Sequence, residues 1–380
     1  MKEKILYVGN FKLPDKNAAA HRVLVNSKIL VKLGYEVILV GVRDEVDTGI
    51  YEHVSEMEGI QMYSVSYPKK IIDWIKFYGS NRNINTILKS QPNLKYFIGY
   101  NYQSLSFLKV YFRLHKKLKF IADTTEWYQP DHKSLLLRAV KKVDTAIRMQ
   151  LINKYLTDGN IVISRFLEKY YKEQKNLRIP PLVDLDDKKW ECLAPKNNNG
   201  TKFIFFGTVG GKKEEISLVL KFFDIISETN KNCRLDIFGI TKKELMNLGT
   251  PNNSNVKAHG RVSHKEALVE VSKSNFSIFF RENNLITRAG FPTKFVESMS
   301  AGTPVITNYS SNLKDYLIHG KNGYAIDIQK LKSNSFTEIK KLEIIESDTE
   351  SMGIKAFETA ENNFHYVNYI NLMDEFLKAI

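Results

Sequence analysis

The sequence predicts an α/β fold made of two Rossmann-like domains in succession. Its 380 residues exceed the size at which a single hydrophobic core stops growing. Short apolar runs alternate with helical patterns in both halves, which is typical of parallel sheets covered by helices. A polar stretch, APKNNNGT, separates the halves. We therefore expect domains at 1–190 and 191–360 facing one another across a cleft, and a C-terminal helix at 361–380 that packs back toward the N-terminal domain.

In the first half, five apolar runs have the length and composition of buried strands. They lie at 5–10, 36–42, 95–101, 119–125 and 159–164. Between the first two, Val23, Ile29 and Leu30 follow helical spacing, and the pattern stops at Gly34. This segment is one strand–helix–strand unit, the building block of a parallel sheet.

The second half repeats the pattern after the polar stretch. Strands are expected at 202–209, 234–240, 257–262, 276–280, 303–308 and 323–327. The segments EEISLVLKFFDIISE and HKEALVEVSKS have helical periodicity between them. Since ligands of such sheets bind beyond the carboxyl ends of the strands, the loops at those ends are where functional residues are expected.

The net charge of +14 lies almost entirely in the N-terminal half, which carries +12 through residue 190. In the block 101–150, Phe107, Tyr111 and Phe112 are interleaved with Lys109 and Arg113. Such a face suits an anionic membrane surface, and the alternative is a solvated face that only maintains solubility. Nucleic acid is not expected as a partner, because no helix-turn-helix, zinc-finger or RNA-binding pattern accompanies the charge.

The N-terminus, MKEKILYVGNF, has an apolar run too short to span a bilayer and no small-residue cleavage site. This indicates a cytoplasmic protein, which its basic half would place peripherally at the inner face of the membrane. Cys192 and Cys233 form no CxxC pair and have no His cluster nearby, so we expect inert thiols.

The segment FPTKFVESMSAGTPVI contains the strongest candidate site. Pro292 precedes a helix that ends at Ala301 before a buried strand. Lys294 and Glu297 are three residues apart and project from one face of that helix. A helix N-terminus with Thr293 and a lysine beside it suits a diphosphate, and a carboxylate one turn later can accept both hydroxyl hydrogens of a ribose. An ordinary surface Lys–Glu pair is the competing interpretation.

From FGTV through GRV and PTKFVESMSAGTPVI to HGKNG, the sequence resembles the donor domain of GT-B glycosyltransferases, in particular the retaining glycosyltransferase family 4 (glycosyl transferases group 1). The resemblance covers most of the chain, with its best match at 202–327 and its loosest at 45–95. It implies a nucleotide-sugar donor site in the C-terminal domain and an acceptor site in the N-terminal domain. Glu297 stands where the family binds the ribose, and Pro292, Lys294 and Glu297 fit the family variant P-x-K-x-x-E.

The chain departs from the family at two positions that the resemblance makes important. Ala289 replaces the first Glu of the family pattern. Thr208 replaces the Arg that follows Gly207, which leaves Lys212 and Lys213 to hold the donor diphosphate, with Lys213 at the better spacing. Two loop arginines ahead of the donor helix are candidates to compensate for the missing charge, or are simply solvated: Arg281 and Arg288.

In the N-terminal half, the loop after the first strand has alanines where the family has a Gly-Gly that approaches the donor phosphates. Ala19 and Ala20 are the matching positions, and His21 and Arg22 start the following helix as candidates for phosphate or acceptor contacts or for capping. Asp123 and Glu126 follow a strand end, where the family often has an acidic or His residue near the acceptor. An ordinary loop carboxylate is the alternative for Glu126.

The resemblance implies transfer of a sugar from a UDP- or GDP-sugar to a glycan or lipid-linked acceptor, with retention, in bacterial cell-surface polysaccharide synthesis. Lys213 and Glu297 are the expected catalytic residues. No metal and no other cofactor are expected, since family members stabilise the departing nucleotide with a helix terminus and basic side chains. Two alternatives are a sugar-nucleotide epimerase of the same fold and a non-catalytic partner subunit, which Ala289 and Thr208 keep open.

Overall fold

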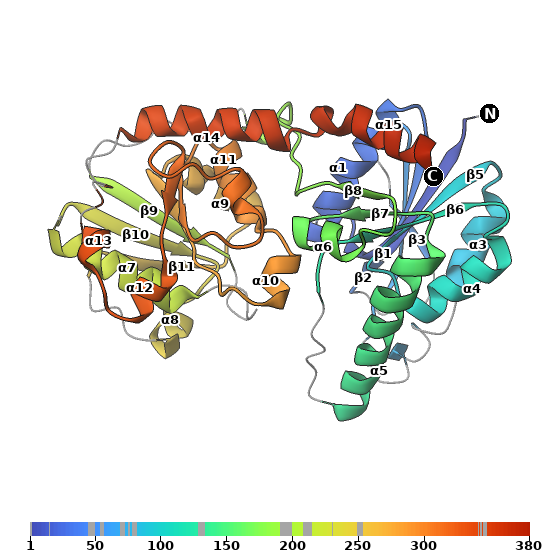
Figure 1. Cartoon of the computed structure of the whole chain (residues 1–380), viewed down its shortest axis with the longest axis horizontal. Coiled ribbons are helices and arrows are strands. Elements are labelled where there is room, and N and C mark those ends of the chain that lie inside the picture. The colour runs from blue at the N-terminus through green and yellow to red at the C-terminus, as the bar shows by residue number, and fades with distance from the viewer. Residues whose placement is uncertain are drawn as a thin grey trace. The chain divides into compact units, whose positions relative to one another are not determined.

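The computed structural model describes residues 2–14, 16–44, 50–53, 57–68, 73–74, 77, 82–127, 134–190, 200–207, 215–229, 231–248, 254–340, 342, 344 and 348–380. The chain divides into two compact units (Figure 1). Unit 1 contains Met1–Leu182, Ala289–Phe291 and Tyr366–Ile380, and unit 2 contains Val183–Arg288 and Pro292–His365. Among the described residues, no helix combines the length and apolar character needed to cross a bilayer.

Unit 1 is built on an eight-stranded sheet in the order β3-β4-β2-β1-β5-β6-β7-β8, and only the β3–β4 pair is antiparallel. The strands are β1 Lys4–Lys12, β2 Glu36–Arg43, β3 Ile50–His53, β4 Ile60–Ser66, β5 Leu94–Tyr100, β6 Lys119–Thr124, β7 Gly159–Val162 and β8 Asn176–Arg178. The helices of this unit are α1 Ala18–Lys32, α3 Arg82–Ser90, α4 Ser104–Leu114, α5 Leu135–Ala146, the π-helix η1 Ile147–Leu156, α6 Arg165–Tyr170, η4 Tyr366–Tyr369 and α15 Ile370–Ala379.

Both faces of this sheet are buried, which is why its central strands are apolar throughout instead of alternating. In β1, Ile5 and Tyr7 join the core cluster that includes residues of α1 and α15. Leu6 and Val8 join the opposite cluster, which contains residues of α3, α4 and η1. The C-terminal helix α15 thus completes the core of the unit in which the chain begins, beside α1 (Figure 1).

Unit 2 has a six-stranded, wholly parallel sheet in the order β11-β10-β9-β12-β13-β14. Its strands are β9 Thr201–Phe206, β10 Cys233–Phe238, β11 Val256–Gly260, β12 Phe276–Ile278, β13 Val305–Thr307 and β14 Gly323–Ala325. Its helical segments are η2 Lys188–Trp190, α7 Ile216–Thr229, α8 Lys242–Leu248, α9 His264–Ser272, α10 Leu285–Ala289, α11 Thr293–Ser300, η3 Leu313–Asp315, α12 Ile328–Lys332, α13 Thr337–Lys340 and α14 Thr349–Phe364.

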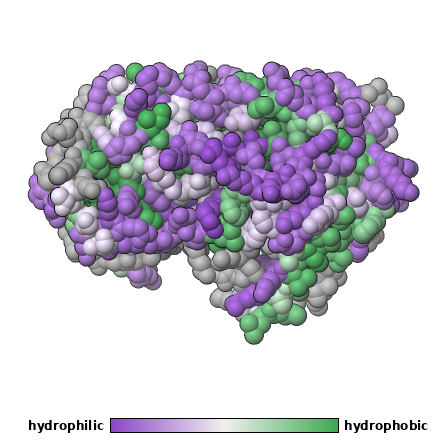
Figure 2. Space-filling view, in the orientation of Figure 1, coloured by the Kyte–Doolittle hydropathy of each residue, from purple (hydrophilic) through white to green (hydrophobic). Residues whose placement is uncertain are grey.

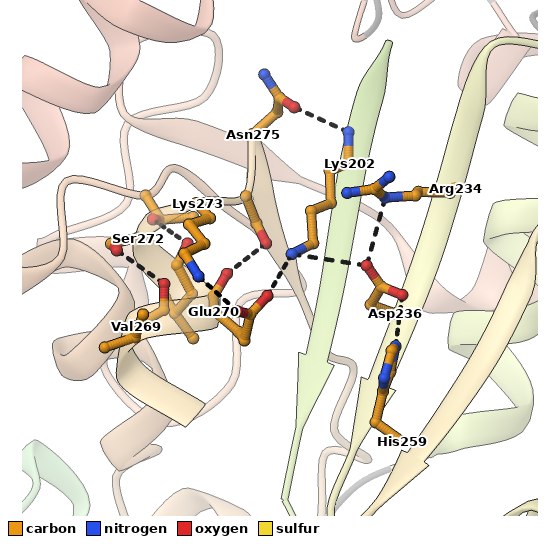
Figure 3. Close-up of polar contacts among 12 residues, drawn as sticks. Lys202, Arg234, Asp236, His259, Val269, Glu270, Ser272, Lys273 and Asn275 are labelled. Atoms are coloured by element: carbon orange, nitrogen blue, oxygen red, sulfur yellow. Dashed lines mark hydrogen bonds and ion pairs between the residues drawn. The ribbon is translucent and has the colours of Figure 1, made fainter. Parts of the chain in front are cut away.

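A cluster of charged side chains joins β9, β10 and β11 to α9 in unit 2 (Figure 3). Lys202 Nζ lies 2.8 Å from Glu270 Oε2 and 3.6 Å from Asp236 Oδ2. The other oxygen of Asp236 lies 2.6 Å from His259 Nε2, and Lys273 holds the second oxygen of Glu270 at 2.9 Å. Lys202 and Asp236 are nearly inaccessible to solvent. The ion pairs that they form with each other and with Glu270 and His259 compensate for burying their two charges on the sheet.

The predicted two-domain α/β fold is confirmed, and each predicted strand matches an observed one, with ends that differ by a few residues. Three observed strands have no predicted counterpart, and they are β3, β4 and β8. β3 and β8 are the two edge strands of the sheet, and β4 interrupts its apolar residues with polar ones in IQMYSVS, so none of them carries the long apolar run of a central strand.

Candidate functional site

The candidate donor site of unit 2 is centred on α11. Pro292 is the residue before the helix, where its fixed φ and missing N–H are tolerated, and the C-cap is Ala301, followed by Gly302 with φ of 63°. Within α11 the only residues that are not buried are Thr293, Lys294 and Glu297. The helix therefore presents one small polar face, and the predicted site residues are the whole of it.

Glu297 is held in place by a residue that sequence reasoning did not select. His264, the first residue of α9, places its Nε2 2.9 Å from Glu297 Oε1. The Glu297 side chain is 18% exposed and His264 54% exposed. Ser263 and Glu266 form a capping box that fixes the start of α9 and so the position of His264. A carboxylate fixed in this way and still open to solvent on one side can accept hydrogen bonds from a diol.

Lys294 of α11 contacts the carboxyl-terminal part of β9. Its Nζ is 5.7 Å from the centroid of the Phe205 ring, close enough for a cation–π contact. One residue beyond β9, Gly207 has φ of 143°, and a Cβ on Gly239 would come within 2.3 Å of the Gly207 carbonyl oxygen. Glycine is thus required where β9 and β10 end, because the two backbones approach each other there.

The two candidate arginines of unit 2 occupy different environments. Arg281 is buried at 3% exposure, and its backbone N–H donates to Asn308 Oδ1 at 2.9 Å while its carbonyl accepts from Asn308 Nδ2 at 2.8 Å. Arg288 is exposed on α10. Three other predicted donor residues, Thr208, Lys212 and Lys213, lie outside the described residues.

Ala289, at the position of the first family glutamate, is completely buried. Its carbonyl oxygen accepts a hydrogen bond of 2.7 Å from Ser164 Oγ, and Ala289 groups with unit 1. A glutamate side chain here would have to displace packed neighbours and bury a charge. The alanine is therefore part of a packed contact.

In unit 1 the residues predicted to line a phosphate loop lie within α1. Asn17 caps this helix by accepting from the Ala20 N–H at 2.9 Å, so Ala19, Ala20 and His21 already belong to its first turns. Ala20 is fully buried, and Ala19 and His21 are half-buried. The expected loop is thus a helix start, because the Asn17 side chain satisfies the otherwise free N–H of Ala20.

Arg22 faces the interior of unit 1. Its Nη2 lies 2.9 Å from Asp123 Oδ1, and its Nη1 donates to the Ile179 carbonyl at 2.9 Å. Asp123 also accepts from the Tyr7 hydroxyl. Arg22 and Asp123 are 4% and 0% exposed. The sequence makes Arg22 a candidate for phosphate or acceptor contacts and Asp123 a candidate near the acceptor, but both are parts of a buried ion pair.

The pKa of Tyr7 is raised well above its ordinary value, mainly by burial and secondly by the negative charge of Asp123. Tyr7 therefore remains protonated and donates a hydrogen bond to this pair. Glu126 is half-buried, two residues beyond β6, and next to the buried Thr125. It is thus the remaining carboxylate candidate at the end of β6. In the described ranges, no three His, Cys, Asp or Glu side chains come together in a group that could hold a metal ion.

Comparison with known proteins finds one family that matches part of the chain. Residues 189–359 match the family described as glycosyl transferases group 1. No curated protein matches the sequence.

Solved structures match over the whole chain at low identity. Sucrose-phosphate synthase from Thermosynechococcus elongatus has a TM-score of 0.64 at 14% identity and covers 99% of this chain and 98% of its own. HepE of Anabaena, solved with UDP and glucose, has a TM-score of 0.64 at 12% identity over 100% of both chains. TarM of S. aureus, solved with UDP and an α-GlcNAc-glycerol, has a TM-score of 0.65 at 10% identity and covers 99% of each. At these identities the likeness establishes the fold.

Proposed function

We propose that this chain is a glycosyltransferase that transfers a sugar from a UDP-sugar to a glycan or lipid-linked acceptor. It has the GT-B fold, and its residues 189–359 match glycosyl transferases group 1. The observation that carries the donor assignment is the polar face of α11, where Thr293, Lys294 and Glu297 alone escape burial. The choice of UDP rests on the nucleotide found in HepE and TarM. GDP is the alternative base.

The reaction proceeds with retention at the anomeric carbon and without a metal. The bond between that carbon and the diphosphate oxygen breaks while an acceptor hydroxyl attacks from the same face, and the hydroxyl proton passes to the departing phosphate. The N-terminal turn of α11, together with Lys294 and Lys213, stabilises the charge that develops on the leaving group. Glu297 fixes the ribose. The acceptor belongs to a cell-surface polysaccharide and is presented at the inner face of a membrane.

The first experiment measures thermal unfolding with UDP, GDP, ADP and their sugars, with and without EDTA. A ligand at a hundred times its dissociation constant stabilises by about 2.7 kcal/mol. We expect UDP compounds to raise the Tm equally in EDTA, with the rise lost in Glu297→Ala and kept in Glu350→Ala, an exposed carboxylate in the first turn of α14. A rise that requires a divalent ion would overturn the metal-free mechanism.

Product analysis separates the alternatives. NMR of the transferred sugar identifies the anomer, and an inverted anomer contradicts the front-side mechanism. An epimerase interconverts sugar nucleotides with no acceptor present, whereas a transferase releases UDP in proportion to the acceptor that is glycosylated. A chain that neither binds nor turns over any sugar nucleotide is a non-catalytic partner subunit.

A further inference from the structure

Exposed apolar side chains concentrate on one face of unit 1, made by α4, α5 and η1. Of the 16 large hydrophobic residues that are exposed among the described residues, seven lie on these three helices: Leu105, Phe112, Leu135, Leu136, Val143, Leu151 and Tyr155. The four most exposed of all 16 are in this set, namely Leu135 at 76%, Tyr155 at 71%, Phe112 at 67% and Leu136 at 61%. We call this surface the α4–α5–η1 face.

The three helices form one connected structure. α5 continues into η1 with helical backbone at Ala146 and Ile147, so residues 135–156 make a single long helix. α4 packs against both parts of it. Figure 2 shows hydrophobic residues gathered over the projecting α5 at the lower edge of the view, with hydrophilic residues beside them.

Every exposed charge on these helices is positive. Lys109 and Arg113 on α4 and Arg138 and Lys142 on α5 are exposed, and Lys141 and Lys154 are half-buried. The one acidic residue, Asp144, is buried at 8% exposure. It accepts hydrogen bonds from the backbone N–H and hydroxyl of Ser104 at 2.7 and 2.8 Å. The carboxylate that would oppose an anionic partner is therefore turned inward and used to join α5 to α4.

Monomeric proteins rarely leave so many large apolar side chains exposed in one place. Here they are combined with lysine and arginine alone, which is the composition of surfaces that lie in a lipid interface: apolar groups enter the acyl boundary and basic groups meet anionic headgroups. A nucleic-acid partner would account for the basic side chains of this face but not for its exposed leucines. We propose that the α4–α5–η1 face docks unit 1 on an anionic lipid bilayer, with Leu135 and Leu136 entering the interface.

The α4–α5–η1 face is a different surface from the α11 site. The proposal rests on the proposed function in one respect: access to a lipid-linked acceptor is the reason for docking. The test is sedimentation of the full chain with vesicles of phosphatidylcholine alone or mixed with phosphatidylglycerol. We expect binding only to the mixed vesicles, with weaker binding at high salt because the headgroup attraction is screened.

Two variants test the two components of the face, Leu135→Ser with Leu136→Ser and Arg138→Gln with Lys142→Gln. Each is expected to weaken binding by about tenfold, since each removes two of the groups that contact lipid. The matched control, Ile354→Ser with Leu372→Ser, changes two apolar residues that are 57% and 45% exposed on other helices, and it should bind like the wild type. Unchanged Tm values establish that all variants are folded.

Two results overturn the proposal: absence of binding to the mixed vesicles, or an equal loss in the control. If binding is absent and the chain forms a concentration-dependent dimer that the face variants abolish, the occupant of the face is a second copy of the chain. UDP-dependent stabilisation is measured on the same variants and is expected to be unchanged. Vesicle binding without any sugar transfer leaves the docking intact and removes the proposed function instead.

Discussion

Glu297 illustrates how a single carboxylate is prepared for a ligand. It projects from the small polar face of α11, a helix whose other residues apart from Thr293 and Lys294 are buried, and His264 Nε2 lies 2.9 Å from one of its oxygens. This contact restricts the side chain in the free protein, so less conformational entropy would be lost in binding the nucleotide of the proposed donor site. His264 is therefore expected to act as a positioning residue, and Glu297 as the residue that contacts the ribose.

Substitutions at Glu297, His264 and Lys294 should separate ribose binding from phosphate binding. Glu297→Gln is expected to weaken the binding of uridine and of UDP by the same factor, about tenfold or more, because hydrogen bonds to a charged group contribute about 1.5–3 kcal/mol. His264→Gln should weaken the binding of both ligands by a smaller factor. Lys294→Gln should weaken the binding of UDP and leave the binding of uridine unchanged. Calorimetric titration measures all three, and an effect of Glu297→Gln on UDP alone would contradict a ribose contact.

Arg22 and Asp123 have a structural role, because neither can reach a ligand without opening a buried ion pair. Asp123→Asn is expected to destabilise unit 1 by about 3–5 kcal/mol, since it leaves Arg22 buried beside a neutral amide. Urea unfolding measures the change. Glu3→Gln is the control, because it breaks the Lys95–Glu3 pair, in which both side chains are exposed, and should cost only about 0–1 kcal/mol.

At the scale of elements, the charged cluster between α9 and the sheet makes unit 2 sensitive to acid. Burial opposes ionisation of Glu270, but hydrogen bonds from Lys202 and Lys273 outweigh it and lower the pKa of Glu270 below its ordinary value. A lowered pKa in the folded state stabilises the fold above the unfolded pKa of about 4.3, and this contribution is lost as the pH falls through the folded pKa.

Glu270→Gln is therefore expected to lower the free energy of unfolding at neutral pH and to reduce its fall in acid. The difference between wild type and variant should shrink as the pH drops below about 4.3. Denaturant titrations at neutral and acidic pH measure this difference. Glu266→Gln is a poor control because Glu266 belongs to a capping box; Glu350→Gln, on α14, is suitable. A difference that stays constant with pH would contradict the role of the ion pairs.

At the scale of the molecule, the chain returns to unit 1 after completing unit 2. Met373, Phe376 and Leu377 of α15 are buried in the same core cluster as β1, and the Tyr96 hydroxyl donates to the Leu377 carbonyl at 3.1 Å. A Cβ on Gly159 would come within 2.7 Å of the Phe376 ring, so glycine is required in β7 for α15 to pack there. The last residues of the chain are thus part of the first core.

Phe376→Ala is expected to destabilise unit 1 by about 3–5 kcal/mol, the usual cost of removing a buried aromatic side chain. Leu372→Ala, on the same helix but 45% exposed, should change stability by no more than about 0.5 kcal/mol. Chemical denaturation with tryptophan fluorescence compares the two. Equal effects would show that α15 contributes little to the core.

The amino-acid sequence alone was enough to predict the fold class, the central strands and the helix from Pro292 to Ala301, because these follow from apolar periodicity and from residues that start or stop helices within a few positions. It also selected Lys294 and Glu297, which are three residues apart on one helix. The Arg22–Asp123 pair joins residues 101 positions apart, and the His264–Glu297 contact joins residues 33 apart. These contacts emerge only from the three-dimensional structure, since they depend on which elements pack side by side. For the same reason, it alone determined which charges are buried, that Asp144 is turned inward, and that the exposed leucines and lysines of α4, α5 and η1 share one face.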